Sequence, residues 1–344
     1  MRHYFRLLIL LALLGAAAVA GWYSLGHEMD RGAATSAPVR IQVAPGEHLR
    51  GILADLKQHG ALRHPRLVEL YLRLGGRTPR VQAGTYEIAA QASARAIIEQ
   101  LAAGRVVLEQ LTVIEGWSFA QMRHALDAHP ALLHELAGRP EAELMAALGH
   151  PDQAAEGRFF PDTYRFASGT SDRRILELAY QRMQRELDQA WSSRAADLPL
   201  AGSDEALTLA SIVEKETGRE DERPEVAAVF VNRLRLGMRL QSDPTVIYGL
   251  GARYDGDIHA RDLVTDTPFN TYTRSGLPPT PIALPGAASL RAALHPAPID
   301  AVYFVATGNG DGTHHFSATL AEHDLALRAY LRKLGVTPAG ARSP

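Results

Sequence analysis

The sequence predicts an α+β protein made of an N-terminal transmembrane helix, a small β-α-α-β subdomain and a larger mixed α+β domain. Three observations predict this class. Residues 7–25 form an apolar run. Residues 39–105 show strand, helix, helix and strand patterns in that order. Residues 106–340 then mix helical and strand patterns without a long internal repeat, so one larger domain follows.

The N-terminal run, Leu7 to Leu25, follows the basic residues Arg2 and Arg6. About 19 residues at about 1.5 Å each are just enough to cross the hydrocarbon core of a bilayer. The positive flank favours a cytoplasmic N-terminus, so the rest of the chain is expected outside the cytoplasm. We therefore predict an anchor over 1–25, with Trp22 at the membrane interface. The alternative is a cleaved signal peptide, because small residues precede Gly21.

Composition limits the classes of function. The net charge of -2 gives no electrostatic reason to expect nucleic acid as a partner. Cysteine is absent, which excludes disulfides, thiolate catalysis and Cys-ligated zinc. The 14 histidines include no pair at a strong metal-site spacing, and His314 and His315 are adjacent on an expected strand, where they point to opposite faces. We expect neither a metal nor another cofactor.

The small subdomain, 39–105, follows a polar, proline-containing segment, 26–38, that is expected to be a linker. The sequence predicts, in order, a strand at 40–43, helices at 49–58 and 65–74, a strand at 84–88 and a helix that Ser93 caps. The β-α-α-β order is that of small glycan-binding LysM modules. A generic α+β subdomain satisfies the same pattern.

The first part of the larger domain is expected to hold a strand at 106–114, helices at 118–128, 130–151 and 174–198, and an irregular loop at 156–164. The loop is rich in aromatic residues around Gly157 and Pro161. Such rings could cover the apolar faces of sugars, although a loop that anchors the core has the same composition.

A helix from the expected cap Ser203 to the stop at Gly218 carries the main candidate for chemistry. Leu209, Ile212 and Val213 stand on one face, and Glu216 continues their stripe. A carboxyl group in such apolar surroundings tends to keep its proton, which suits a general acid.

Glu214 competes with Glu216 for that role. The two residues are two positions apart, so on a helix they point about 200° apart and cannot form a side-by-side pair. We favour Glu216 as the acid and Glu214 as a supporting or exposed residue. The alternative is that both lie on a solvated helix end beside Lys215.

After this helix the sequence predicts a second one at 224–236, and a short third helix that Asp243 can cap. A long loop at 262–286 is rich in Pro, Thr and Gly and is expected to carry function or fixed turns. Strands at 301–306 and 314–316 and a helix at 322–333 complete the domain.

Several motifs resemble the MltG (YceG-like) endolytic murein transglycosylases, in the order expected for that family. They are Phe160-Pro161-Asp162-Thr163-Tyr164, Ala210-Ser211-Ile212-Val213-Glu214-Lys215-Glu216-Thr217, Asn232-Arg233-Leu234, Leu240-Gln241-Ser242-Asp243-Pro244-Thr245-Val246, Asn270-Thr271-Tyr272, Gly276-Leu277-Pro278-Pro279 and Tyr303-Phe304-Val305. The similarity covers nearly the whole chain. Ser242 stands where some relatives have Thr, which keeps a hydroxyl.

The resemblance implies a single-pass inner-membrane anchor, a LysM-like subdomain and a catalytic domain in the periplasm, over 106–340, that cuts nascent peptidoglycan strands. It places the essential acid at Glu216. The expected product has a 1,6-anhydro-N-acetylmuramic acid end, cutting is expected to end strand elongation, and peptidoglycan synthases (penicillin-binding proteins) are expected partners.

Four residues are expected to hold the sugar amides and hydroxyls: Gln241, Asp243, Asn270 and Tyr272. Each could instead be a turn or cap residue. Two other classes of function remain open. A lysozyme-like hydrolase could pair Glu216 with Asp243 as its second carboxylate, and a non-catalytic wall-binding scaffold could use the same surface without chemistry.

Overall fold

The computed structural model describes residues 2–33, 35–76 and 78–335. It contains helices and short two-stranded sheets, as predicted for an α+β protein. The chain divides into two compact units. The first comprises Met1–Gln110, Pro130–Leu133 and Arg165–Ser171, and the second comprises Leu111–His129, His134–Tyr164 and Asp172–Pro344. Residues 336–340 of the expected catalytic domain lie outside the described residues.

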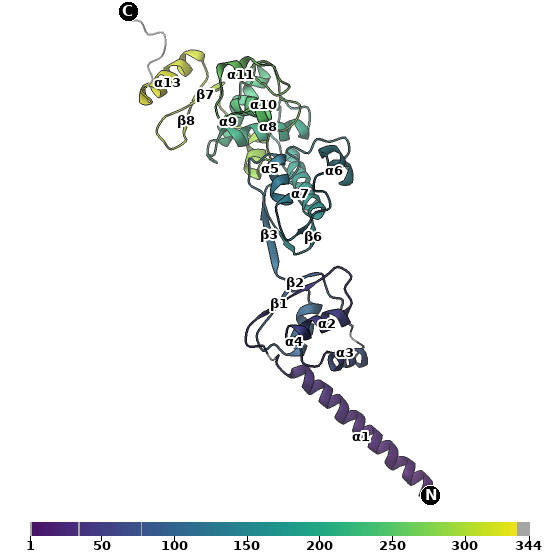
Figure 1. Cartoon of the computed structure of the whole chain (residues 1–344). Coiled ribbons are helices and arrows are strands. Elements are labelled where there is room, and N and C mark those ends of the chain that lie inside the picture. The colour runs from purple at the N-terminus through teal and green to yellow at the C-terminus, as the bar shows by residue number, and fades with distance from the viewer. Residues whose placement is uncertain (1, 34, 77, 336–344) are drawn as a thin grey trace, which may run out of the picture. The chain divides into compact units, whose positions relative to one another are not determined.

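The first unit contains the predicted strand, helix, helix and strand in order, with one helix before them and one after (Figure 1). Its main elements are α1 (Arg2–Asp30), β1 (Val39–Val43), α2 (Leu49–Gln58), α3 (Pro65–Leu74), β2 (Gly84–Ile88) and α4 (Ala94–Ala102). Strands β1 and β2 are antiparallel, with Val39 opposite Ile88. Ser93 caps α4 as expected, because its side chain accepts a hydrogen bond from the Ala96 amide.

Helix α1 is longer than the expected anchor. It continues through residues 26–30, which were expected to belong to the linker. Met29 explains the extension, because its side chain is buried in the core of the unit with residues of α2, α3 and α4. Within the described residues, α1 is the one helix long and apolar enough to cross a membrane.

The second unit is mainly helical. Its helices are α5 (Phe119–Asp127), α6 (Glu141–Ala147), α7 (Asp172–Ser192), α8 (Ser203–Glu216), α9 (Arg223–Arg235), α10 (Asp243–Leu250), η1 (Gly251–Arg253), α11 (Ala260–Val264), α12 (Ala287–Leu294) and α13 (Leu320–Lys333). The short strands β7 (Tyr303–Ala306) and β8 (His314–Ser317) pair antiparallel before α13. The strands β3 (Leu108–Thr112) and β5 (Thr163–Ala167) pair with each other, and the residues of each are divided between the two units. The parallel strands β4 (Leu132–Leu133) and β6 (Thr170–Ser171) also pair, and both belong to the first unit.

The segment 130–151 differs from the predicted helix. It holds β4 and the short α6, and an irregular stretch lies between them. The buried carboxylate of Asp172 accepts hydrogen bonds from the Glu135 and Leu136 amides, so this backbone is bonded to a side chain and not within a helix. The helix was predicted from the Ala, Leu and Glu content of this segment. That composition does not show that Asp172, which lies outside the segment, binds its backbone.

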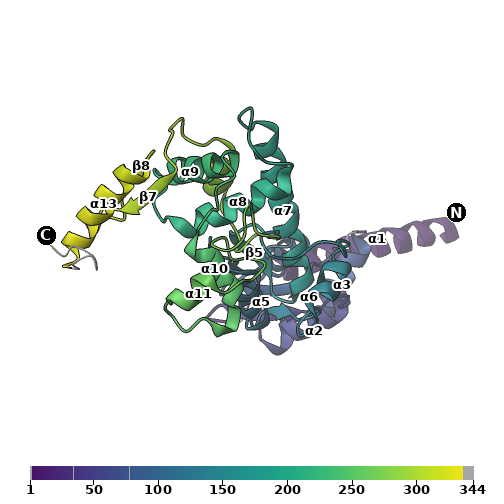
Figure 2. The ribbon, with the colours of Figure 1, turned by 90° about the horizontal axis from the view of Figure 1, so that it is seen from above.

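The core of the second unit forms around α8. Helices α7, α9 and α10 lie around α8 (Figure 2), and α12 packs against it as well. Residues 206–213 are buried without a break, which explains why this stretch is apolar on nearly all sides. A helix enclosed in this way holds the side chains at its end in a fixed position.

Candidate active site

Helix α8 ends at Glu216, where the backbone of Thr217 becomes extended, with φ -140° and ψ 133°. The helix begins one residue earlier than a Ser203 cap would give, because Gly202 is the cap and Ser203 is the first helical residue. At the other end, the last two turns carry both acidic residues that were expected to compete for catalysis. The structure gives them different surroundings.

The side chain of Glu214 is only 5% exposed, and both of its carboxylate oxygens have partners within the protein. Its Oε1 lies 3.3 Å from Nη2 of Arg223, at the start of α9, and its Oε2 accepts a hydrogen bond of 2.9 Å from the Gly286 amide. Glu214 therefore ties α8 to α9 and to the cap of α12. This is the supporting role expected for it, and the solvated-helix-end alternative does not apply to its side chain.

Glu216 points to another part of the unit. Its Oε1 accepts a hydrogen bond of 2.5 Å from the Ser242 hydroxyl. Burial is the main reason that the pKa of Glu216 is raised to about 7, and the negative charge of Asp243 raises it further. The hydrogen bond from Ser242 and the charge of Arg233 act in the opposite direction. Near neutral pH this carboxyl group can therefore both give and take a proton.

The start of α10 supplies the partners of Glu216. Ser242 is the N-cap residue, but its hydroxyl does not bond to the helix because it donates to Glu216. The first helical residue is Asp243, which was expected to be the cap. Its Oδ1 accepts a hydrogen bond of 2.6 Å from the Tyr272 hydroxyl. Burial is the main reason that the pKa of Tyr272 is raised, so its hydroxyl keeps its proton and remains a donor.

Arg233 on α9 holds the segment that leads to Ser242. Its guanidinium donates hydrogen bonds of 2.6 Å to the carbonyls of Val302 and Leu240, and it lies over the ring of Tyr303. Burial lowers the pKa of Arg233. The sequence contained a signal for this residue, since Arg233 continues the apolar stripe of Val226 and Phe230 as Glu216 continues its own.

Gln241 is exposed and lies directly before Ser242. Its φ is 52°, a left-handed conformation that is uncommon for residues other than glycine. Its amide donates to the Thr271 carbonyl at 3.2 Å, which joins this segment to the loop that carries Tyr272. Non-glycine residues in this region often occur at functional sites.

Asn270 has a different position from the one expected of a sugar ligand. Its exposed fraction is 0%. Its Nδ2 donates to three carbonyls, the nearest being that of Thr265 at 2.7 Å, and its Oδ1 accepts from the Tyr272 amide at 2.8 Å. The amide group is thus used inside the loop, and the expected direct contact with a sugar is not open to it. Asn270 instead fixes the backbone that presents Tyr272.

A further buried carboxyl group, Glu156, has a pKa raised as far as that of Glu216 and was not singled out from the sequence. Its Oε1 accepts from the Phe119 amide at 2.9 Å and its Oε2 from the Tyr248 hydroxyl at 3.1 Å. Burial raises its pKa to about 7. Glu156 lies in an irregular loop, where no helical or strand period marks a buried charge, so the sequence offered no pattern to find it.

No group of three or more His, Asp or Glu residues gathers as a metal site within the residues that the structure describes. His314 is engaged elsewhere, because its Nδ1 lies 2.7 Å from Oε2 of Glu222. The site around Glu216 therefore consists of one carboxyl group of raised pKa, a hydroxyl bonded to it, and a carboxylate–phenol pair on the neighbouring segment. Such a set can transfer a proton to and from a bound substrate.

Comparisons with known proteins identify the family of this chain. The YceG-like family model matches residues 41–329. The chain is 30% identical to the endolytic murein transglycosylase of Bacillus subtilis (strain 168), over 85% of each chain. It is 26% identical to the endolytic murein transglycosylase of Streptococcus pneumoniae (serotype 2 strain D39), over 92% of this chain and 63% of the relative. A crystal structure of a YceG-like protein from Listeria monocytogenes is similar with a TM-score of 0.49 and 26% identity, covering 84% of this chain and 98% of that one. Because the family model matches most of its length and the Bacillus subtilis relative is 30% identical over 85% of each chain, this chain belongs to the YceG-like family.

Proposed function

We propose that this protein is an endolytic murein transglycosylase that cuts the β-1,4 bond between N-acetylmuramic acid and N-acetylglucosamine. The observation that carries the proposal is the carboxyl group of Glu216, which burial keeps protonated to about pH 7 beside the Ser242 hydroxyl. Two relatives named endolytic murein transglycosylases support the substrate and the reaction.

In the first step, protonated Glu216 donates its proton to the oxygen that leaves with N-acetylglucosamine. The bond from this oxygen to C1 of N-acetylmuramic acid breaks as C1 develops oxocarbenium character. The hydrogen bond from Ser242 is suited to stabilise the carboxylate that remains on Glu216.

In the second step, the C6 hydroxyl of the same N-acetylmuramic acid attacks its C1, and the Glu216 carboxylate takes the hydroxyl proton. A 1,6-anhydro ring forms, the enzyme regains its proton and no water is consumed. One carboxyl group serves both steps. The attack is intramolecular, which gains effective molarity and reduces the need for a second catalytic group.

We assign Gln241, Asp243 and Tyr272 to the surface that holds the sugar amides and hydroxyls. Gln241 is exposed in a fixed, uncommon backbone conformation, and Asp243 and Tyr272 hold each other by the 2.6 Å hydrogen bond. We assign Asn270 a positioning role through the Tyr272 amide. Arg233 has a similar role for the segment that leads to Ser242.

We further propose that α1 anchors the protein in the inner membrane by a single pass, with the catalytic domain in the periplasm. Residues 39–105 are assigned to a LysM-like glycan-binding subdomain, supported by the order of β1, α2, α3 and β2. Cutting nascent strands within their length would end their elongation, and peptidoglycan synthases are the partners this role requires.

A hydrolase is the second candidate, because Asp243 lies near enough to Glu216 for its charge to raise the pKa of Glu216. In that mechanism Asp243 would activate water. Mass spectrometry of products from defined, uncrosslinked glycan strands separates the two. Anhydro ends that disappear in Glu216→Gln support the transglycosylase; reducing N-acetylmuramic acid ends as the main product replace it with the hydrolase, and unchanged strands refute both.

A further inference from the structure

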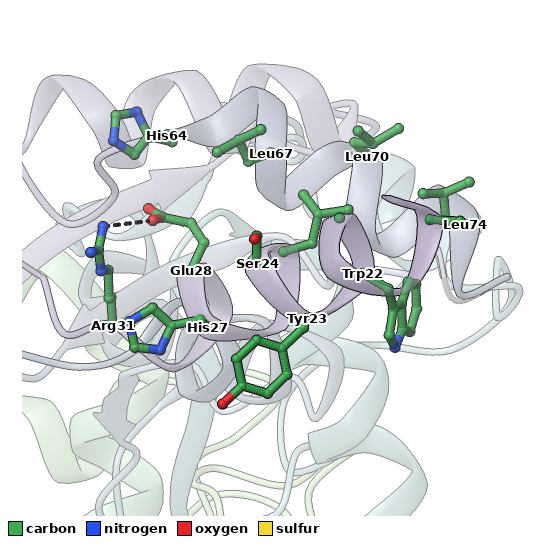
Figure 3. A pocket seen from close by; sticks show the side chains of 13 residues that line it. Trp22, Tyr23, Ser24, His27, Glu28, Arg31, His64, Leu67, Leu70 and Leu74 are labelled. Carbon is green, nitrogen blue, oxygen red and sulfur yellow. Dashed lines mark hydrogen bonds and ion pairs between the residues drawn. The ribbon is translucent and has the colours of Figure 1, made fainter. Parts of the chain in front are cut away.

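A groove of about 980 Å³ lies between the second half of α1 and helix α3, both in the first unit. Its walls are fixed to each other. The ring of Trp22 on α1 stacks on that of Tyr71 on α3, with centroids 5.1 Å apart, and Met29 of α1 is buried in the core of the unit. The groove is therefore a built feature of this unit (Figure 3).

Helix α3 carries two apolar stripes. Val68 and Leu72 form the inner stripe, which is buried in the core. The outer stripe consists of Leu67, Leu70 and Leu74, whose exposed fractions are 40%, 45% and 62%. These three side chains line the groove. Exposed leucines at this regular spacing have no function in the core of the unit, so the outer stripe requires another apolar partner.

The groove is polar at one end and apolar at the other. Figure 3 shows His64, Glu28 and Arg31 at one end, where Nη1 of Arg31 lies 3.3 Å from Oε2 of Glu28, and Leu74 and Trp22 at the other. This is the order of polarity along a phospholipid, which has a charged headgroup and apolar tails.

The direction of this gradient agrees with the direction of α1. A hydrocarbon core of about 30 Å takes up about 20 helical residues. If the span begins near Leu7, it ends near Leu25, where the apolar end of the groove gives way to the polar end at His27 and Glu28. The outer stripe then lies at the depth of the lipid tails, and the polar end lies at the depth of the headgroups.

We propose that this groove binds a phospholipid of the leaflet from which α1 emerges. The acyl chains lie along Leu67, Leu70 and Leu74, and the phosphate-bearing headgroup lies beside His64 and Arg31. This inference rests on the membrane anchor proposed above. It adds a second, lipid-contacting helix to that anchor, so the first unit is seated at the surface of the bilayer.

The absence of cysteine in the natural sequence allows a direct test with the full chain. Single substitutions His64→Cys, Leu67→Cys, Leu70→Cys and Leu74→Cys are spin-labelled and placed in phosphatidylcholine vesicles. Collision rates with oxygen, which enters lipid, and with a nickel chelate, which stays in water, report the depth of each label. Leu108→Cys is the matched control, because Leu108 is a leucine of the same unit outside the groove whose exposed fraction, 57%, lies within the range of the three groove leucines. Leu11→Cys reports on the span itself.

We expect oxygen collisions to dominate at Leu74 and Leu70, to weaken at Leu67 and to give way to nickel collisions at His64, while Leu108 is fully accessible to nickel. If the labels at Leu67, Leu70 and Leu74 are as accessible to nickel as the label at Leu108 while Leu11 lies in lipid, the proposal that the groove binds lipid is wrong. The membrane anchor would then still hold. A water-exposed label at Leu11 would contradict the membrane anchor itself, and with it the lipid proposal that rests on the anchor. Labels shielded from both reagents would mean that protein, such as a second copy of the chain, covers the groove instead of lipid.

Discussion

The Ser242 hydroxyl donates a hydrogen bond of 2.5 Å to Oε1 of Glu216, across 26 positions of sequence. It joins the residue before α10 to the last residue of α8. Burial holds the proton on Glu216, whereas this bond favours its loss, so the pKa of about 7 is a balance of the two. That balance can be measured through pH and substitution.

The first prediction concerns the pH dependence of kcat/KM. Since Glu216 must carry its proton to act as an acid, kcat/KM should fall as the pH rises through about 7. Ser242→Ala removes a hydrogen bond that favours the carboxylate, so the pKa rises and the fall moves to higher pH. Ser242→Thr keeps the hydroxyl and should leave the profile near that of the wild type.

Asp243→Asn gives the opposite sign. It removes a negative charge that raises the pKa of Glu216, so the fall in kcat/KM should move to lower pH. Profiles measured side by side for Ser242→Ala and Asp243→Asn decide the matter. Shifts in the same direction would show that another group titrates.

The second prediction separates the two acidic residues of α8. Glu216→Gln should lower kcat by about 10²–10⁴-fold, the usual contribution of a general acid, and should remain folded. Glu214→Gln should keep the chemistry but lose stability, by at most roughly 3–5 kcal/mol, because buried Arg223 loses its ion pair with Glu214 and keeps only the longer one, of 4.0 Å, with Glu115. Rates on glycan strands and thermal melts of both variants provide the test. A stable, inactive Glu214→Gln would reverse the assignment.

The third prediction concerns stability and pH. The pKa of Glu216 is raised from 4.5 to about 7 in the folded state. Between these two values the unfolded chain loses the proton while the folded chain keeps it, so the free energy of unfolding falls as the pH rises. The destabilisation is absent below about pH 4.5, grows up to pH 7 and is complete above it, at roughly 3 kcal/mol.

Glu216→Gln should therefore be more stable than the wild type at pH 8 and equal to it near pH 4.5. Urea unfolding at both values measures the difference. Glu143→Gln, which changes an exposed acid of the same unit, is the control and should show no such dependence on pH. An equal gain for both variants would remove the burial of Glu216 as the cause.

The fourth prediction concerns isotopes in the product. When strands are cut in H₂¹⁸O, the new N-acetylmuramic acid ends should contain no ¹⁸O, because the nucleophile is the C6 hydroxyl of the sugar. Asp243→Asn should still form anhydro ends, although more slowly if Asp243 holds the sugar. Incorporation of ¹⁸O that disappears in Asp243→Asn would identify Asp243 as the group that activates water.

The sequence was most informative where a pattern is local. The stripe of Leu209, Ile212 and Val213 led to Glu216, and the helix geometry separated it from Glu214. The orders of strands and helices around β1 and β2 followed from short-range periods and turn residues. These features depend on neighbours within a few residues, which the sequence displays directly.

The rest depended on partners far along the chain. The residues around Ser242 do not show that its hydroxyl donates to Glu216 and makes no capping hydrogen bond to α10, because Glu216 lies on another helix. Asn270 looked like a polar loop residue, but the carbonyls that surround it come from a turn whose shape only the folded loop defines. Met29 extended α1 for the same reason, since its burial depends on three other helices.

The position of Glu216 as the last residue of α8 has an electrostatic consequence. The aligned peptide dipoles of a helix place partial negative charge at its C-terminus and partial positive charge at its N-terminus. Glu216 therefore meets the negative end of α8, and Asp243 lies in the first turn of α10, at its positive end. Each effect is worth about 0.3–1 kcal/mol at an exposed helix end. The backbone thus disfavours a negative charge on Glu216 and favours one on Asp243. Because the peptide dipoles cause this difference, substitution of nearby side chains would not remove it.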